Sequence, residues 1–328
     1  MNPDLNVVVL DDNIARFRDD FESRLPAGAH ASFPDRTDET AVQDSLRDAH
    51  VLVSAAFTAD TAAMAKDLLL LLVPGAGLNG VDRAALPADV PVCNTFHHED
   101  SIAEYVVAAS VLLRRGFLTQ DAALRTGRWH SPVYRPELPY SRALVGATVG
   151  FVGFGHIGQR TWELFRAFRA RGVAVTRRGD IDAAAAGLEW SGTIADLDDL
   201  LAAADVVVLS APLTPQTTGL IGAAQLAAMK TDAILVNVGR GPLVDAASLA
   251  NALRDNAIGG AAIDVWWTYP TSGDTAAPTE YPLPESANVL MTPHSSGLSE
   301  QTFAGRIADM TDNIARLAVG RPLLNVVG

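Results

Sequence analysis

Three closely spaced glycines that follow an apolar run restrict the fold of this chain more than any other feature. The run covers residues 147–152, and its small, β-branched and aromatic side chains are typical of a buried strand. Gly153, Gly155 and Gly158 come next, together with apolar residues at helical spacing: Ile157, Leu164, Phe165 and Phe168. In such a unit the first glycine allows the turn, the second lets the backbone approach a pyrophosphate, and the third lets helix and strand pack closely. The segment predicts a dinucleotide site at a helix N-terminus, with an ordinary glycine-rich loop as the alternative.

Length, charge and cysteine usage narrow the class of protein. At 328 residues the chain is longer than one hydrophobic core usually grows, so we expect two domains, and 48% hydrophobic residues are enough for both. The net charge of −13 argues against nucleic acid or an anionic membrane as a partner. The longest apolar run, residues 68–73, is too short to cross a bilayer, and the N-terminal residues show no signal-like pattern. We therefore expect a cytoplasmic protein. The single cysteine, Cys93, cannot form an internal disulfide or supply a metal cluster, which fits a reducing compartment, and it is more simply a core residue than a nucleophile.

The first hundred residues repeat short apolar runs separated by helix-compatible segments. The runs cover residues 6–10, 51–54, 68–73 and 90–93, and the first is followed by Ile14, Phe17 and Phe21 at helical spacing. This order predicts a small parallel α/β domain. Within it, Ala76 and Gly77 lie in a turn after a strand, and their N–H groups can receive a carboxylate unless the turn is merely structural.

The rest of the chain predicts a second, larger α/β domain. Ser101 is expected to cap the helix that leads into it, and residues 117–142 are expected to form an irregular loop that is functional or an oligomer arm. Strands are then expected at residues 147–152, 173–175, 205–210, 233–238, 260–265 and 288–292, with helices at 196–204 and 245–256. The alternation predicts a doubly wound parallel sheet. A last helix over residues 300–319 is expected to return to the first domain.

Polar residues follow several of the expected strands, where ligands of open α/β sheets bind. Arg240 stands between two glycines after one strand, Asp264 lies in the next, and His294 follows a strand-ending proline. Each residue alone is more often structural. Their common position makes them candidates for one site.

These motifs together resemble the D-isomer-specific 2-hydroxyacid dehydrogenases, which include glycerate, phosphoglycerate and formate dehydrogenases. The matching segments are the glycine motif, Ala211-Pro212-Leu213-Thr214, Val236-Asn237-x-Gly239-Arg240-Gly241, Ala262-Ile263-Asp264-Val265 and Thr292-Pro293-His294. The resemblance implies two Rossmann-like, doubly wound α/β domains: a split, flavodoxin-like substrate domain (1–100 plus 296–328) and a dinucleotide-binding domain (101–295). It also implies an NAD or NADP cofactor, a small carboxylic acid substrate and a homodimer.

The resemblance assigns roles to individual residues. Hydride would pass between the nicotinamide and the substrate carbon, while Arg240 holds the carboxylate and the reacting oxygen and His294 transfers the proton. The backbone N–H groups of Ala76 and Gly77 would fix the carboxylate, and Asp264 would contact the nicotinamide carboxamide or hold Arg240. The expected cofactor-binding residues are Gly153, Gly155, His156, Ile157, Gly158, Arg177, Arg178, Ala211, Pro212, Thr217, Val238 and Asp264.

The chain departs from the family at the position five residues after Asp264. The family usually has a glutamate there that pairs with the histidine, whereas this chain has Tyr269. Without that carboxylate the pKa of His294 should be less elevated, which weakens reduction of 2-oxo acids at neutral pH. Formate dehydrogenases also lack the glutamate, so an unusual substrate is an alternative. Glu280 or Glu285 could supply a carboxylate from the loop instead.

Two further departures concern substrate and cofactor. His98 stands where many family members have an asparagine that faces the substrate, and it would favour an extra negative charge on the substrate; otherwise His97 and His98 are solvent-facing loop residues. Arg177 and Arg178 follow residues 173–175, where an aspartate would bind the ribose of NAD. These arginines favour NADP over NAD, although Asp180 could restore NAD use and the arginines could be ordinary surface charge.

The sequence thus predicts an oxidoreductase that transfers a hydride between a nicotinamide cofactor and a small D-2-hydroxy or 2-oxo acid. A dehydrogenase for formate or a phosphonate-type acid is the first alternative. A dinucleotide-sensing scaffold without catalysis is the second, and the retention of both Arg240 and His294 argues against it.

Overall fold

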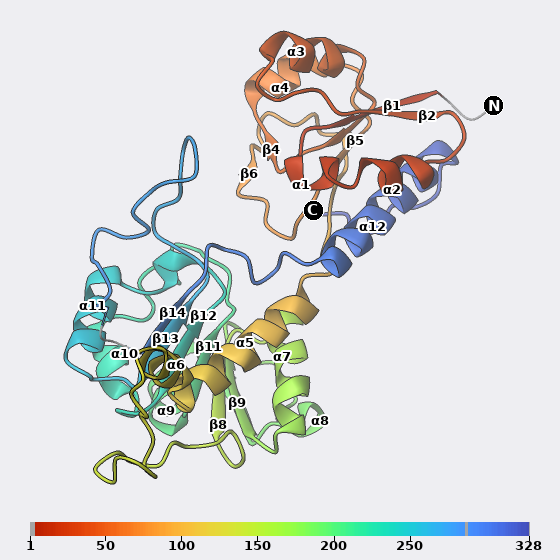
Figure 1. Cartoon of the computed structure of the whole chain (residues 1–328). Coiled ribbons are helices and arrows are strands. Elements are labelled where there is room, and N and C mark those ends of the chain that lie inside the picture. The colour runs from red at the N-terminus through yellow and green to blue at the C-terminus, as the bar shows by residue number, and fades with distance from the viewer. Residues whose placement is uncertain (1–3, 286–287, 328) are drawn as a thin grey trace. The chain divides into compact units, whose positions relative to one another are not determined.

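The computed structural model describes residues 4–285 and 288–327 of the chain. These form two compact units: residues 1–98 with 298–328, and residues 99–297 (Figure 1). Each unit is built on a parallel sheet. No helix in the described part of the chain is long and apolar enough to span a membrane.

The first unit contains a five-stranded parallel sheet in the order β2-β1-β3-β5-β7. Its strands are β1 (Leu5–Val9), β2 (Ala29–Ser32), β3 (Val51–Val53), β5 (Leu70–Val73) and β7 (Val92–Asn94), and β4 (Ala56–Phe57) and β6 (Gly80–Val81) form a separate pair. Counted along the chain, this is the strand order of flavodoxin-like sheets. The prediction of a small parallel α/β domain is confirmed.

Helices cover both faces of this first sheet. They are α1 (Asp12–Ala15), α2 (Arg18–Ser23), α3 (Glu39–Arg47), α4 (Ala59–Met64) and α12 (Glu300–Ala318). Val7 and Val9 of β1 pack with Phe21 of α2 and Ile307 of α12, whereas the intervening Val8 faces the opposite core. This alternation follows from the two-residue period of a strand. Through Ile307, the C-terminal helix α12 packs in the same unit as the N-terminal residues.

The second unit contains a seven-stranded parallel sheet in the order β10-β9-β8-β11-β12-β13-β14. Its strands are β8 (Thr148–Val152), β9 (Arg171–Thr176), β10 (Trp190–Thr193), β11 (Val206–Leu209), β12 (Ile234–Asn237), β13 (Gly260–Ile263) and β14 (Val289–Met291). The first six strands follow the order 3-2-1-4-5-6 of the Rossmann fold. The strand order reverses between β8 and β11, so the crevice where such sheets bind ligands lies beyond the carboxyl ends of these two strands.

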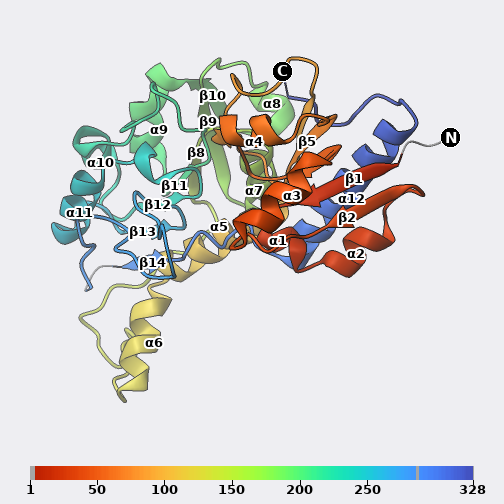
Figure 2. The same ribbon diagram turned by 90° about the horizontal axis from the view of Figure 1, so that it is seen from above.

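The helices of the second unit form a layer on each face of its sheet (Figure 2). α5 (Glu99–Arg114) and α7 (His156–Ala167) pack on one face, and α9 (Leu197–Ala203), α10 (Ala223–Ala228) and α11 (Ala246–Arg254) pack on the other. The remaining elements are α6 (Phe117–Arg125), α8 (Ala183–Ala186) and two 3₁₀ turns, η1 (Ile194–Asp196) and η2 (Gly241–Leu243). The predicted doubly wound parallel sheet is confirmed.

The structure corrects several local expectations. Strands β2 and β10 were not expected, because their residues are only partly buried and carry no continuous apolar run. Part of the segment expected to be irregular forms α6, which ends at Arg125. Ser101 does not cap α5, since the helix already begins at Glu99. The acidic residues of its first turn interact favourably with the helix dipole.

Candidate active site

The glycine motif forms the turn between β8 and α7. Gly153 has a left-handed φ of 92°, and a side chain there would place its Cβ 2.7 Å from the backbone nitrogen of Ala211. A Cβ at Gly158 would lie 2.8 Å from the carbonyl oxygen of Gly153. A Cβ at Gly155, in contrast, would meet no protein atom within 4 Å. The first and third glycines are therefore needed for packing, while the second leaves open space beside the backbone.

The N-terminus of α7 lies next to that open space. Gly155 is the N-cap residue, and no side chain caps the helix. His156 is exposed and Ile157 packs partly against the core. The first N–H groups of a helix carry a partial positive charge, so this terminus suits a pyrophosphate. The geometry fits the predicted dinucleotide.

The end of β9 carries the two arginines considered for cofactor choice. Arg177 and Arg178 are both exposed. Arg178 forms an ion pair with Asp180, with Nε and Oδ2 2.8 Å apart, whereas no ion pair of Arg177 occurs among the described residues. The carboxylate of Asp180 is thus already paired with a neighbouring arginine.

The loop after β11 is organised by its own hydrogen bonds. The hydroxyl of Thr217 accepts a hydrogen bond of 2.8 Å from the N–H of Thr214 and donates one of 2.8 Å to the carbonyl of Pro212. Ala211 is partly buried against Gly153, and Pro212 is exposed. Val238, after β12, is buried, and its N–H donates to the carbonyl of Leu209. The Thr217 hydroxyl therefore shapes this loop.

A buried asparagine holds the backbone around Arg240. The side chain of Asn237 donates a hydrogen bond of 3.0 Å to the carbonyl of Arg240 and accepts one of 3.1 Å from the N–H of Gly239. Arg240 Nη1 donates to the carbonyl of Gly239 at 2.7 Å. Gly241 lies so close to the backbone of Trp266 that a Cβ would be 2.4 Å from its carbonyl carbon. Arg240 is thus presented on a rigid turn.

Asp264 is a buried carboxylate, 1% exposed, that organises the segment containing His294. Its Oδ1 accepts hydrogen bonds from the Thr292 hydroxyl (2.6 Å) and the Ser295 N–H (2.9 Å). Its Oδ2 accepts from the N–H of Ser296 (3.0 Å) and from the Ser296 hydroxyl. In the described structure these carboxylate hydrogen bonds go to the two flanks of His294 and none goes to Arg240. A contact of Asp264 with the nicotinamide carboxamide or with Arg240 stays a prediction.

His294 lies within this segment in a left-handed conformation, with φ at 56°. Its side chain reaches solvent, yet the surrounding protein lowers the pKa of the imidazole below its ordinary value, chiefly through burial. The charge of Arg240 lowers this pKa further, and that of Asp264 opposes the shift. This lowered pKa favours the neutral form of the His294 imidazole.

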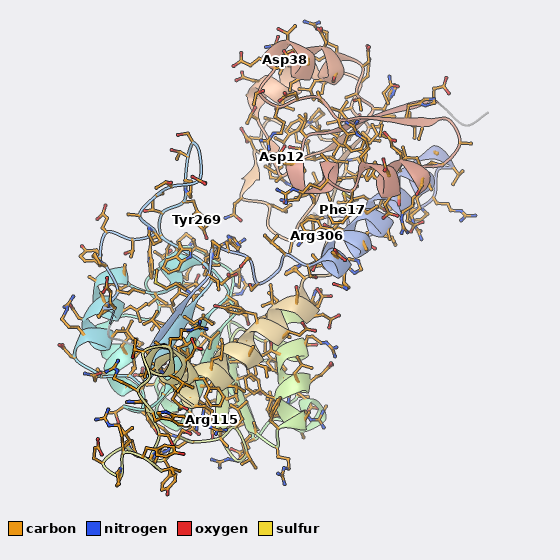
Figure 3. All side chains as sticks on the ribbon, viewed as in Figure 1. Asp12, Phe17, Asp38, Arg115, Tyr269 and Arg306 are labelled. Carbon is orange, nitrogen blue, oxygen red and sulfur yellow. The ribbon has the colours of Figure 1, made fainter. Side chains whose placement is uncertain are left out.

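Tyr269, labelled in Figure 3, lies beside His294 but turns its hydroxyl elsewhere. The two ring centroids are 5.6 Å apart. The Tyr269 hydroxyl accepts a hydrogen bond of 3.0 Å from the N–H of Trp266. Glu280 and Glu285 are exposed, and neither forms an ion pair with His294 in the described structure. No carboxylate pairs with the imidazole among these residues.

The predicted substrate residues Ala76, Gly77 and His98 belong to the first unit. The carbonyl of Ala76 accepts a hydrogen bond of 3.0 Å from the Asn94 side chain, which fixes the turn. In the described part of the chain no protein acceptor takes the N–H of Ala76 or Gly77. His97 is exposed and paired with Asp309 at 2.9 Å, whereas His98 is half-buried, so the alternative of two solvent-facing histidines holds for His97 and not for His98.

Several residues of this site had no role assigned from the sequence, although Asn237 and Thr292 lie in the matching motifs. Asn237, Thr292, Ser295 and Ser296 orient Arg240 and His294 through the hydrogen bonds above, and the hydroxyl of Tyr105 shares a hydrogen bond of 3.0 Å with that of Thr292. Burial, with the charge of Asp264, raises the pKa of Tyr105 to about 12. The run of hydroxyl residues around His294 was the available signal. No group of three or more His, Cys, Asp or Glu that could hold a metal occurs among the described residues.

Comparison with known proteins agrees with this geometry. Residues 107–296 match the family described as D-isomer specific 2-hydroxyacid dehydrogenase, NAD binding domain. The chain is 32% identical over 268 residues to a glycerate dehydrogenase from Methylorubrum extorquens, covering 80% of each chain. A D-isomer specific 2-hydroxyacid dehydrogenase family protein from Aeromonas salmonicida has a similar structure, with a TM-score of 0.84, 25% identity and 99% of each chain covered.

A formate dehydrogenase from Granulicella is also similar, with a TM-score of 0.76 and 26% identity over 95% of this chain and 82% of that one. The strand-order reversal, the glycine turn and the matches of sequence and structure lead to one conclusion. This chain belongs to the D-isomer specific 2-hydroxyacid dehydrogenase family and is an NAD(P)-dependent oxidoreductase that acts on CH–OH groups.

Proposed function

We propose that this enzyme interconverts a small D-2-hydroxy acid and its 2-oxo acid, with Arg240 and His294 as the catalytic residues. One observation carries the assignment: Arg240 follows β12 and His294 follows β14, at the same edge of the sheet as the open turn at Gly155. Each residue is also held by a buried polar side chain, Asn237 for Arg240 and Asp264 for His294. Rigid presentation of a cation and an imidazole at a ligand edge is what hydride transfer to a carbonyl requires.

The chain's own residues would bind the acid and move its proton. Arg240 would hold the carboxylate and polarise the reacting oxygen, because its planar guanidinium can donate two parallel hydrogen bonds. His294 would give a proton to that oxygen in reduction and take it in oxidation. The N–H groups of Ala76 and Gly77 would donate to the carboxylate, and His98 would contact a second polar group of the acid. A bound nicotinamide cofactor supplies the hydride or accepts it.

For the cofactor we propose NADP over NAD. Arg177 is the residue that supports this choice, because it is exposed at the end of β9 and no acid pairs with it among the described residues, whereas Arg178 is held by Asp180. We expect Arg177→Gln to raise the KM for NADPH about tenfold and to leave that for NADH nearly unchanged. Arg178→Gln is the matched control with a smaller expected effect. Equal losses for both cofactors would contradict the proposal.

A second candidate is oxidation of formate or another acid that releases no proton to the enzyme. The specific observation in its favour is the lowered pKa of His294 beside Tyr269, without a carboxylate partner among the described residues. We propose that Tyr269 occupies the position of the family's glutamate. Formate oxidation needs neither a proton donor nor a proton acceptor, whereas reduction of a 2-oxo acid needs a protonated imidazole.

The test is cofactor absorbance with a panel of acids. Purified protein with NADPH or NADH is mixed with glyoxylate, hydroxypyruvate and larger 2-oxo acids, and the oxidised cofactors are mixed with formate and 2-hydroxy acids. We expect turnover that falls at least a hundredfold in Arg240→Ala and in His294→Ala, and that is unchanged in Arg254→Ala, an exposed arginine of α11. Tight cofactor binding without turnover of any acid would favour a sensing scaffold instead.

We also propose that the chain forms a homodimer through the segment after α6. Large apolar side chains are exposed there, including Trp129 (59%) and Tyr140 (86%), and Trp129 packs against Tyr134 with ring centroids 5.0 Å apart. A monomer seldom exposes so many aromatic side chains in one segment. Sedimentation should give the mass of a dimer for the wild type and of a monomer for Trp129→Asp combined with Tyr140→Asp.

A cytosolic location stays a prediction that the lone buried Cys93 favours.

A further inference from the structure

A pocket of about 320 Å³ opens at the edge of the second unit opposite the candidate active site. Its wall residues lie before β8 (Leu144 and Val145), at the end of α5 and after α7. Candidate catalytic residues follow the strands, whereas these residues precede them. The five residues of β8 span about 16 Å, so the pocket is separate from the glycine turn at the other end of this strand. Figure 3 shows Arg115, one of its residues, at the other end of this unit from Tyr269.

Positive charge dominates the lining of this pocket. Four arginines line it and no acid does: Arg114, Arg115, Arg142 and Arg169. Two acids outside the lining pair with these arginines: Asp205 lies 3.9 Å from Arg114 and also pairs with Lys230 at 3.2 Å, and Asp232 pairs with Arg142 at 2.8 Å. The ends of α5 and α7 add roughly half a negative charge each. Positive charge remains in excess, in a chain whose net charge is −13.

Arg114 carries hydrogen-bonding capacity that the protein does not use. Its side chain is only 4% exposed. Two of its nitrogens donate to the carbonyls of Asp205 (3.2 Å) and Ala143 (3.4 Å), while Nε is buried and has no hydrogen-bond partner in the described structure. A buried guanidinium normally satisfies its donors, because each unpaired donor costs free energy. An acceptor close to Arg114 would relieve this cost.

Arg169 occupies a backbone position that favours glycine. The N–H of Arg169 donates to Arg166 and the N–H of Ala170 donates to Phe165, which is the Schellman arrangement at the end of α7. Arg169 takes its left-handed position with φ at 58°. Its carbonyl accepts from the N–H of Gly146, which fixes it at the pocket wall, and it forms no ion pair among the described residues. Arg169 therefore strains the backbone, and no ion pair in the described structure offsets this cost.

The remaining wall is apolar. Val111, Leu144, Val145 and Phe168 line the pocket beside the arginines, and Val145 and Phe168 are exposed. A volume near 320 Å³ is at the lower end for sites that hold small organic molecules. We propose that this pocket binds a small organic anion, a phosphate or carboxylate group on an apolar body, with Arg142 and Arg169 contacting the anion. This second site goes beyond the proposed enzymatic function and does not depend on it.

The test is calorimetric titration of the full chain with phenyl phosphate and with benzoate, repeated with NADPH present. Inorganic phosphate and benzyl alcohol test the anion and the ring separately. Because a charged pair with planar geometry is lost, Arg169→Gly and Arg142→Gln should each weaken binding roughly tenfold. Asn256→Gly makes the same backbone change at the left-handed residue after α11, and Arg254→Gln removes a charge there. Both controls should bind like the wild type.

We expect one molecule bound per chain, tighter than either inorganic phosphate or benzyl alcohol and weaker at high salt. Tighter binding of phenyl phosphate would identify a phosphate ester as the natural class, and tighter binding of benzoate a carboxylate. Arg169→Gly should not lower the midpoint of thermal unfolding, since glycine relieves the left-handed backbone. Unchanged affinity in both pocket variants, or no binding to the wild type because a second copy covers the pocket, would overturn the proposal.

Discussion

The ring of Tyr269 lies 5.6 Å from the imidazole of His294, yet its hydroxyl binds the N–H of Trp266. The tyrosine therefore shields one side of the histidine without giving it a negative partner. This relationship, together with the lowered pKa of His294, sets the chemistry that we expect from the enzyme.

Placing a carboxylate at position 269 should change the proton chemistry of His294. Tyr269→Glu introduces a negative charge next to the imidazole, which raises its pKa by about one unit. Reduction of a 2-oxo acid at neutral pH should then rise severalfold, as measured by kcat/KM across pH. Tyr269→Gln, with the same shape and no charge, should leave the pH midpoint in place. A shift of equal size in the glutamine variant would show that the tyrosine ring, and not the charge, sets the pKa.

The wild-type enzyme should show an unusual pH dependence. Reduction needs a protonated His294, and burial lowers its pKa, so kcat/KM for reduction should fall with rising pH around a midpoint below ~6.5. Oxidation of a 2-hydroxy acid needs the neutral imidazole, and it should persist to a lower pH for the same reason. Both profiles can be recorded with one substrate pair. A midpoint above neutrality in either direction would contradict the assignment of His294.

Asp264 should be essential for the loop that carries His294. Asp264→Asn replaces one carboxylate oxygen with a donor, which then faces the N–H and hydroxyl donors of residues 292–296. We expect a loss of about 2–3 kcal/mol in the free energy of unfolding, measured in urea, and a large loss of turnover. Ser296→Ala removes a single donor and should cost about 1 kcal/mol. Equal costs for the two variants would mean that the carboxylate does not organise the loop.

Substitutions of two glycines in the β8–α7 turn should affect different properties, one the stability of the protein and the other cofactor binding. Gly158→Ala places a methyl group 2.8 Å from the carbonyl oxygen of Gly153 and should cost about 2 kcal/mol of unfolding free energy. Gly155→Ala meets no protein atom and should keep wild-type stability, while weakening NADPH binding about tenfold because the methyl group enters the space for the pyrophosphate. Wild-type affinity in Gly155→Ala would place the cofactor elsewhere.

The sequence predicted the elements whose side chains are uniformly apolar and missed those that lie at sheet edges. β8, β11 and β12 are buried on both faces, so their composition alone indicates strands. β10 is an edge strand of partly buried residues, and its pairing with β9 depends on a neighbour far along the chain. α6 was missed because its local hydrophobic pattern is weak and few of its residues are buried.

The candidate site, too, could be predicted from the sequence only in part. Motif spacing pointed to Arg240, Asp264 and His294, because residues after parallel strands share one edge of the sheet. The partners of Asp264 could not be assigned from sequence, since a carboxylate in a strand gives no sign of which donors will fold over it. The same holds for the four arginines of the second pocket, which come from α5, from the segment before β8 and from the end of α7.

The sequence by itself determined the family, the doubly wound fold and the nucleotide turn, since glycine spacing and apolar runs act through local backbone conformation and burial. Only the tertiary structure decided where Tyr269 directs its hydroxyl, which donors satisfy Asp264, and that Arg169 and Arg142 line one pocket. These relationships depend on side-chain directions between residues far apart in the chain, and hydrogen bonds form only where the packed fold brings donor and acceptor within about 3 Å.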